Sequence, residues 1–188
     1  MINSGMEDRL HGSIFVFLKR FVESRYDYST WLKLLEKAEI DRESYNLHEM
    51  YPTGELNAIV AMASEITGIT ETELHEEFGE FLVPDLLLMY RKNIDPSWRT
   101  FEMLLHTEAV MHGAVRKEDS RTSPPILNIS KVHSKLLVID YHSKRRMAGI
   151  AIGIIKGIAR YYNEAEMVQV IPVTSRSAER VQLRIEFE

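Results

Sequence analysis

The chain contains no cysteine, which excludes disulfides, thiolate-bound zinc, iron–sulfur clusters and cysteine nucleophiles. It also lacks any apolar stretch near the roughly 20 residues that a membrane-spanning helix needs. The longest candidate, Met147 to Ala159, is interrupted by Lys156. The N-terminus has acidic residues before a short apolar run and no small-residue cleavage site, so it does not resemble a signal peptide. We therefore expect a cytoplasmic protein without a membrane segment.

The basic residues are few and scattered. The chain has 23 Lys and Arg against 28 Asp and Glu, and its net charge is −5. It therefore lacks the cluster of basic residues that nucleic-acid binding requires. The 45% hydrophobic and 27% charged residues are typical of a globular protein. A length of 188 residues suits one domain with its own core, and we found no repeat or linker.

The first two thirds of the chain have the apolar spacing of helices. Within the long pattern from Thr70 to Asn93, Pro84 removes an amide donor, so we expect a break or kink around Phe81 to Pro84. The other expected helices are 11–23, 28–40, 53–66, which should end at Gly68, and one from Ser97 through His112.

The pattern then changes to strands. Residues 126–132 and 135–141 predict a hairpin with its turn at His133–Ser134, and residues 167–174 and 180–187 predict two more strands. Between them, residues 146–162 predict a helix that is apolar almost all round. The chain is thus expected to be α+β, with an antiparallel sheet of about four strands.

Residues from four short segments could together bind an iron–porphyrin. Twelve residues separate His112 from Pro125, and fifteen separate Pro125 from the sequence Tyr141-x-Ser143-x-Arg145. Haem needs a nitrogen ligand for its iron and donors for its two propionates. His112 could supply the first, and the alternating side chains of Tyr141, Ser143 and Arg145, which share one strand face, could supply the second.

Each piece also has a plain structural explanation. A single histidine on a helix is more often a packed core or surface residue, and His106 lies only six residues earlier. Pro124–Pro125 makes a rigid turn before a strand, and the polar triplet could be a solvated strand end. Gly149, Gly153 and Gly157 recur every four residues, which favours close packing of the helix against another backbone.

The chain resembles the haem nitric oxide/oxygen-binding (H-NOX) family, the bacterial relatives of the haem domain of soluble guanylate cyclase. The resemblance covers nearly the whole chain, and the spaced His112…Pro125…Tyr141-x-Ser143-x-Arg145 signature is its specific part. The other matching segments are HGSIFVFLKRFV, FGEFLVP at 78–84, the apolar helix with Gly153 and Gly157, and VQLRIEF.

The resemblance implies one domain over 1–188, with haem b (iron protoporphyrin IX) held between a helical distal part, 1–68, and a proximal part, 69–188, that carries the sheet. His112 would be the axial iron ligand, and Pro125 would press on the porphyrin. Tyr141, Ser143 and Arg145 would hold the propionates.

The resemblance also implies an apolar distal pocket. Oxygen-binding members use a distal tyrosine, and the corresponding residue here is Ile150. We therefore expect a sensor that binds nitric oxide and CO at ferrous haem and excludes oxygen. The pocket residues implied are Ile14, Leu18, Leu82, Ile150 and Ile154.

The sensor is expected to signal in trans, to a histidine kinase or a cyclic-di-nucleotide enzyme. The acidic residues Glu71, Glu73, Glu76 and Glu77 could form a docking patch, although a solvated helix face explains them more simply. Among the alternatives, a haem peroxidase would need a distal acid–base group that Ile150 and Ile154 do not offer, so we expect no enzyme activity. A haem-free or haem-storing binding module of the same fold stays open.

Overall fold

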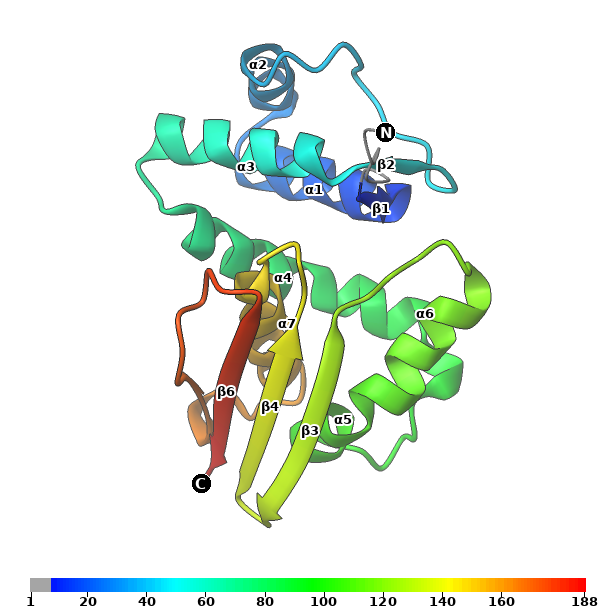
Figure 1. The fold of residues 1–188 in the computed structure, drawn as a ribbon, viewed down its shortest axis with the longest axis vertical. Coiled ribbons are helices and arrows are strands. Elements are labelled where there is room, and N and C mark those ends of the chain that lie inside the picture. The colour runs from blue at the N-terminus through cyan, green and yellow to red at the C-terminus, as the bar shows by residue number, and fades with distance from the viewer. Residues whose placement is uncertain (1–7) are drawn as a thin grey trace, which may run out of the picture. The chain divides into compact units, whose positions relative to one another are not determined.

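The computed structural model describes residues 8–188. They form two compact units divided between Glu71 and Thr72, which we describe separately (Figure 1). No helix within residues 8–188 is long and apolar enough to cross a bilayer.

The first unit consists of three helices and a small two-stranded sheet. The helices are α1 (Gly12–Arg25), α2 (Tyr28–Lys37) and α3 (Thr53–Thr67). Strand β1 (Arg9–His11) pairs antiparallel with β2 (Met50–Pro52), a sheet that sequence patterning missed because three-residue strands are too short to show alternation. The core includes Phe15, Trp31 and Leu56, all with 0% exposed surface. As expected, α3 ends at Gly68, whose φ of 73° suits a residue without a Cβ.

The helices of the second unit precede and interrupt its sheet. They are α4 (Glu71–Met89), α5 (Thr100–His106), the π-helix η2 (Thr107–His112), α6 (Gly113–Glu118) and α7 (Ala148–Tyr161), with short 3₁₀ turns η1 (Arg91–Asn93) and η3 (Ala165–Met167).

Two expectations about these helices need correction. Helix α4 runs without a break through Pro84; the proline is exposed, whereas Leu82, Val83 and Leu87 beside it are buried, and this packing outweighs one lost hydrogen bond. The helix expected from Ser97 to His112 begins at Thr100 and changes to π-helical geometry at Thr107. Single π turns inside helices occur frequently at functional sites.

The sheet of the second unit is fully antiparallel, in the order β3-β4-β6-β5. Its strands are β3 (Ile126–His133), β4 (Leu136–His142), β5 (Val168–Pro172) and β6 (Arg180–Phe187). The hairpin turn lies at Ser134–Lys135, one residue later than expected. The α+β class and the four-stranded antiparallel sheet are confirmed.

One face of this sheet forms the core of the second unit. Alternate residues of β4 lie directly opposite alternate residues of β6, and all are at most 3% exposed. Helix α7 covers this face with Ile152, Ile155 and Ile158 (Figure 1). The opposed pairs are Leu137 with Ile185, Ile139 with Leu183, and Tyr141 with Val181.

The glycine stripe of α7 packs against α4. A Cβ at Gly153 would overlap the carbonyl oxygen of Glu76, and one at Gly157 would lie 2.6 Å from the side chain of Val83. From the other side, a Cβ at Gly79 of α4 would overlap the carbonyl oxygen of Ile150. The close-packing interpretation of the stripe is therefore confirmed.

Candidate functional site

His112 is the last residue of the π-helix and is largely buried, with 16% of its side chain exposed. Its Nδ1 lies 2.8 Å from Oε2 of Glu108, one turn earlier in the same helix. The main-chain carbonyl of Pro125 also accepts a hydrogen bond from the ring. Burial lowers the pKa of His112, and the hydrogen bond to Glu108 offsets this only in part. The imidazole is therefore neutral at neutral pH, as a metal ligand must be.

Glu108 contacts the predicted iron ligand, and the sequence reasoning did not single it out. Its Oε2 accepts a hydrogen bond from the amide of Leu127 at 3.1 Å as well as contacting His112, and its Oε1 pairs with Arg116 at 2.6 Å. Burial acts to raise the pKa of Glu108, but hydrogen bonds from Arg116, His112 and Leu127 outweigh it and lower the pKa. The spacing Glu108-x-x-x-His112, which places both side chains on one helix face, was the available signal.

The predicted polar triplet lies at the end of β4 and in the turn after it. Tyr141 is 3% exposed and its hydroxyl is hydrogen-bonded to Ser143. Burial raises the pKa of Tyr141, and the hydrogen bonds from Ser143 and from the main chain of Met147 offset this only in part. The Oγ of Ser143 accepts from the amide of Arg145 at 3.3 Å. The three residues are therefore brought together: Tyr141 and Ser143 are buried, and Arg145 is partly exposed.

The segment 123–127 joins these two groups of residues. The guanidinium of Arg145 donates to the carbonyl of Ser123 at 2.5 Å. The ring of His112 lies against the main chain of Pro125. Leu127 bonds to Glu108 and is the direct ladder partner of Tyr141. This segment of five residues thus connects the predicted ligand, the predicted wedge and the predicted propionate donors.

The apolar residues expected around the iron are divided between the units. In the second unit, Leu82 of α4 is 2% exposed, whereas Ile150 and Ile154 of α7 are partly buried and one helical turn apart. In the first unit, Ile14 is partly buried and Leu18 is 3% exposed, and they lie one turn apart on α1. None of the five side chains carries a hydrogen-bond donor.

His75 of α4 is a buried group that the sequence reasoning did not single out. It is 9% exposed, and its Nε2 has no hydrogen-bond partner. Burial lowers the pKa of His75 to about 4, so the ring is neutral at pH 7. Its Cβ packs where Gly149 of α7 leaves room, since a Cβ at Gly149 would lie 2.8 Å from it. His75 precedes Leu82 by seven residues, about 10 Å along a helix.

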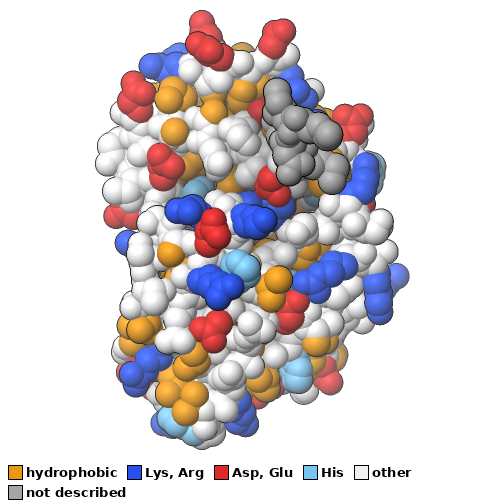
Figure 2. Space-filling view, in the orientation of Figure 1, with side chains coloured by type: hydrophobic (Ala, Val, Ile, Leu, Met, Phe, Trp, Pro, Cys, Tyr) orange, Lys and Arg blue, Asp and Glu red, His pale blue; other side chains and the backbone are white. Residues whose placement is uncertain are grey.

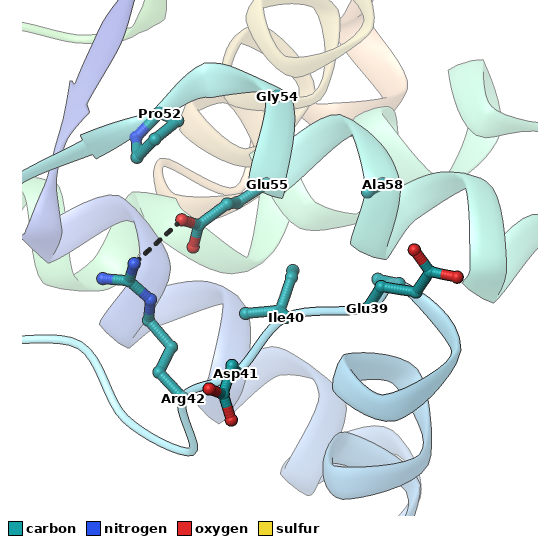
Figure 3. Close-up of a pocket in the computed structure, with 9 residues that line it drawn as sticks. Glu39, Ile40, Asp41, Arg42, Pro52, Gly54, Glu55 and Ala58 are labelled. Carbon is teal, nitrogen blue, oxygen red and sulfur yellow. Dashed lines mark ion pairs between the residues drawn. The ribbon is translucent and has the colours of Figure 1, made fainter.

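A separate hollow of about 410 Å³ lies in the first unit, at the start of α3 (Figure 3). Arg42 pairs with Glu55 across it at 3.2 Å and stacks over the rings of Tyr45 and Tyr51. None of the predicted site residues lines this hollow.

The expected acidic patch is partly neutralised within the chain. Glu76 pairs with Lys156 at 2.8 Å and with Arg176. Figure 2 shows charged side chains of both signs interspersed on the face in view. Of the four acidic residues, Glu71 and Glu73 are exposed, whereas the side chain of Glu76 is only 14% exposed beneath its two cationic partners.

The donor set of the site fits haem. Porphyrin iron takes a histidine nitrogen from the protein, and the Nδ1 of His112 contacts the Glu108 carboxylate, so Nε2 is the ring nitrogen that would bind a metal. The propionates need cationic and hydroxyl donors, and Arg145, Ser143 and Tyr141 lie together. The five N–H groups of a guanidinium allow Arg145 to hold a carboxylate as well as the Ser123 carbonyl.

Comparisons with known proteins agree with this chemistry. The haem-NO-binding family matches residues 11–170. An H-NOX protein from S. oneidensis in the Fe(II)NO state is 25% identical, with a TM-score of 0.86 over 95% of this chain and 99% of its own. The H-NOX domain from Shewanella oneidensis in the Fe(II)CO state (24%, TM-score 0.82, 95% and 99%) and the unliganded Fe(II) H-NOX protein from K. algicida (19%, 0.86, 95% and 97%) share the fold.

No curated protein matched the chain. The family match nevertheless spans both units and includes His112 and the polar triplet. Together with the shared fold and the haem-compatible donor set, it shows that this chain belongs to the haem-NO-binding (H-NOX) family and is a haem-based gas sensor.

Proposed function

We propose that this chain is a nitric oxide sensor that holds haem b through His112 and discriminates against oxygen. The convergence of His112, Tyr141 and Arg145 on the segment 123–127 supports the site most directly. Residues far apart in the sequence, with the chemistries that haem iron and haem propionates need, meet at one short turn.

Each residue has a separate role in this proposal. His112 would provide a nitrogen to the iron, and Pro125, fixed in φ and close to the His112 ring, would press on the macrocycle. Tyr141, Ser143 and Arg145 bind the propionates. Non-covalent haem b is favoured because the 188 residues contain no cysteine for thioether attachment.

Oxygen discrimination rests on the apolar side chains. When bound, ferrous haem supplies an iron that nitric oxide ligates strongly without help, whereas dioxygen is stabilised by a distal hydrogen-bond donor. Leu82, Ile150 and Ile154 cannot donate, and neither can Ile14 or Leu18 in the first unit. The buried imidazole of His75 can donate a hydrogen bond, but it is not one of these five residues and lies two turns before Leu82, about 10 Å along the helix.

The proposed signalling role is taken from the sequence. In the proposal, residues 1–68 form the distal part and residues 69–188 the proximal part. Gas binding signals in trans to a partner such as a histidine kinase or a cyclic-di-nucleotide enzyme. The cytoplasmic location and the identity of this partner stay predictions from the sequence.

A haem-free or haem-storing module of the same fold is the alternative. The cluster of Tyr141, Ser143 and Arg145 favours the sensor over a haem-free module, because an empty apolar cavity has no use for carboxylate donors. Haem storage differs from sensing in its kinetics, since a store must release haem readily to an acceptor protein.

The test is the absorption spectrum of the purified, reduced protein in air and after nitric oxide is added. We expect a ferrous haem spectrum that air leaves unchanged and nitric oxide shifts. A stable oxygenated spectrum in air would contradict the discrimination, and no haem uptake after reconstitution would contradict the sensor. Haem transfer to apomyoglobin within seconds would favour storage.

A further inference from the structure

The carboxylate of Glu108 contacts three donors from three consecutive parts of the second unit. Its Oε2 lies 2.8 Å from Nδ1 of His112 and 3.1 Å from the amide nitrogen of Leu127 in β3. Its Oε1 lies 2.6 Å from a guanidinium nitrogen of Arg116 in α6. Only 29% of the Glu108 side chain is exposed, so both oxygens are held in defined directions.

The contact with Leu127 has a structural cause in the sheet. β3 is an edge strand in the order β3-β4-β6-β5, so alternate amides point away from the ladder and need another partner. Glu108 supplies that partner for Leu127. The same carboxylate therefore ties the π-helix of His112 to the strand that begins directly after Pro125.

The contact with His112 has a chemical consequence. An imidazole that donates its Nδ1 proton to a carboxylate is held in one tautomer, with its unprotonated Nε2 directed elsewhere. It is also a stronger electron donor through Nε2 than an imidazole bonded to water or to a neutral carbonyl, because the carboxylate draws the Nδ1 proton towards itself.

We propose that Glu108 is the positioning residue of the haem site. It selects the Nδ1–H tautomer of His112, strengthens Nε2 as an iron ligand, and fixes the ligand helix to β3. This inference rests on the proposed function, because it takes His112 as the axial ligand. By strengthening Nε2 as a donor, Glu108 would set how firmly His112 holds the iron when a gas is bound.

The first experiment needs no haem. In the haem-free protein labelled with ¹⁵N-histidine, long-range ¹H–¹⁵N correlation spectra distinguish the two imidazole tautomers at pH 7.5 to 8. We expect His112 of the wild type to be almost entirely Nδ1–H, and Glu108→Ala to shift it to a mixture or to Nε2–H. An unchanged tautomer in Glu108→Ala would overturn the positioning role.

The second experiment measures the effect on iron. In the reduced haem-loaded protein, Glu108→Gln, which keeps the shape and loses the charge, should lower the iron–histidine stretching frequency in resonance Raman spectra. It should also move the reduction potential to more positive values. Equal frequencies and potentials in the variant and the wild type would contradict the strengthening of Nε2.

A matched control separates this role from folding. Arg116→Ala removes the other partner of Glu108 but leaves the contact with His112, so its tautomer and iron–histidine frequency should stay near those of the wild type. Thermal unfolding of each variant tests for loss of structure. If Glu108→Ala fails to fold, the His112 tautomer is measured in Glu108→Gln instead. Failure of the wild type to bind haem would contradict the proposed function, while the tautomer comparison would still decide whether Glu108 positions His112.

Discussion

The guanidinium of Arg145 and the main-chain carbonyl of Ser123 are 22 residues apart in sequence, yet they form a hydrogen bond of 2.5 Å. This bond holds the turn before β3 against the turn after β4. Pro125 lies two residues beyond Ser123, and Ser143 two residues before Arg145. The bond between Arg145 and Ser123 thus connects Pro125, which is expected to press on the porphyrin, with the expected propionate donors.

Replacing Arg145 with Ala should weaken haem retention. A charge-assisted hydrogen bond to a propionate contributes roughly 1.5–3 kcal/mol, so haem transfer to apomyoglobin should become about 10-fold faster or more. Lys144→Ala is the matched control, because this neighbouring cation is exposed and should leave the rate unchanged. Equal rates for the two variants would show that Arg145 does not hold a propionate.

Replacing Ile150 with Tyr should allow the reduced protein to bind oxygen. A phenol on this partly buried turn of α7 would add the hydrogen-bond donor that the apolar residues lack. The measurement is the absorption spectrum of the reduced protein in air, compared with that of Ile150→Phe, which adds the ring without the hydroxyl. If both variants bind oxygen equally, pocket size and not hydrogen bonding controls the discrimination.

Replacing Gly79 with Ala should destabilise the second unit. The added methyl group would overlap the backbone carbonyl of Ile150, and a backbone cannot yield as a flexible side chain does. Overpacking of this kind costs about 1–3 kcal/mol, measurable as a lower midpoint in urea unfolding. Gly54→Ala, where nothing lies within 4 Å of the new Cβ, should leave stability unchanged or slightly raised; an equal loss there would contradict the packing explanation.

His75 should make stability depend on pH in the acid range. Its pKa is about 4 in the folded protein against 6.5 for the free side chain, so between these values the unfolded chain binds a proton that the folded protein does not. Stability is therefore fully present above pH 6.5 and falls as the pH drops towards 4, by up to about 3 kcal/mol. The check is the free energy of unfolding as a function of pH.

His75→Leu is the variant for that comparison, because it removes the titrating group and keeps an apolar side chain in the same space. Between pH 6.5 and 4, its unfolding free energy should fall less steeply than that of the wild type. Parallel curves over this range would show that another group causes the acid sensitivity.

Much of the fold was predictable from sequence because it is encoded locally. Helices α1, α2 and α3 begin within one residue of their expected starts, and β6 has its expected bounds. Their apolar spacing matches their secondary structure, and Gly68 ends α3 as its conformational freedom predicts. The uninterrupted α4 was not predictable, since the effect of Pro84 depends on the burial of Leu82, Val83 and Leu87 by other segments.

The sequence by itself determined the inventory of the site: the residue types at His112, Pro125, Tyr141, Ser143 and Arg145, and the spacing by which the family is recognised. Tertiary structure decided the rest. It placed Glu108 beside His112 within one π-helical segment. It also placed Glu108 beside the amide of Leu127, which has no ladder partner on the edge of β3. It also buried His75 without a partner. The contacts of Glu108 with Leu127 and of His75 with Gly149 join residues far apart in the chain, so of these contacts only the Glu108-x-x-x-His112 spacing is visible in the sequence.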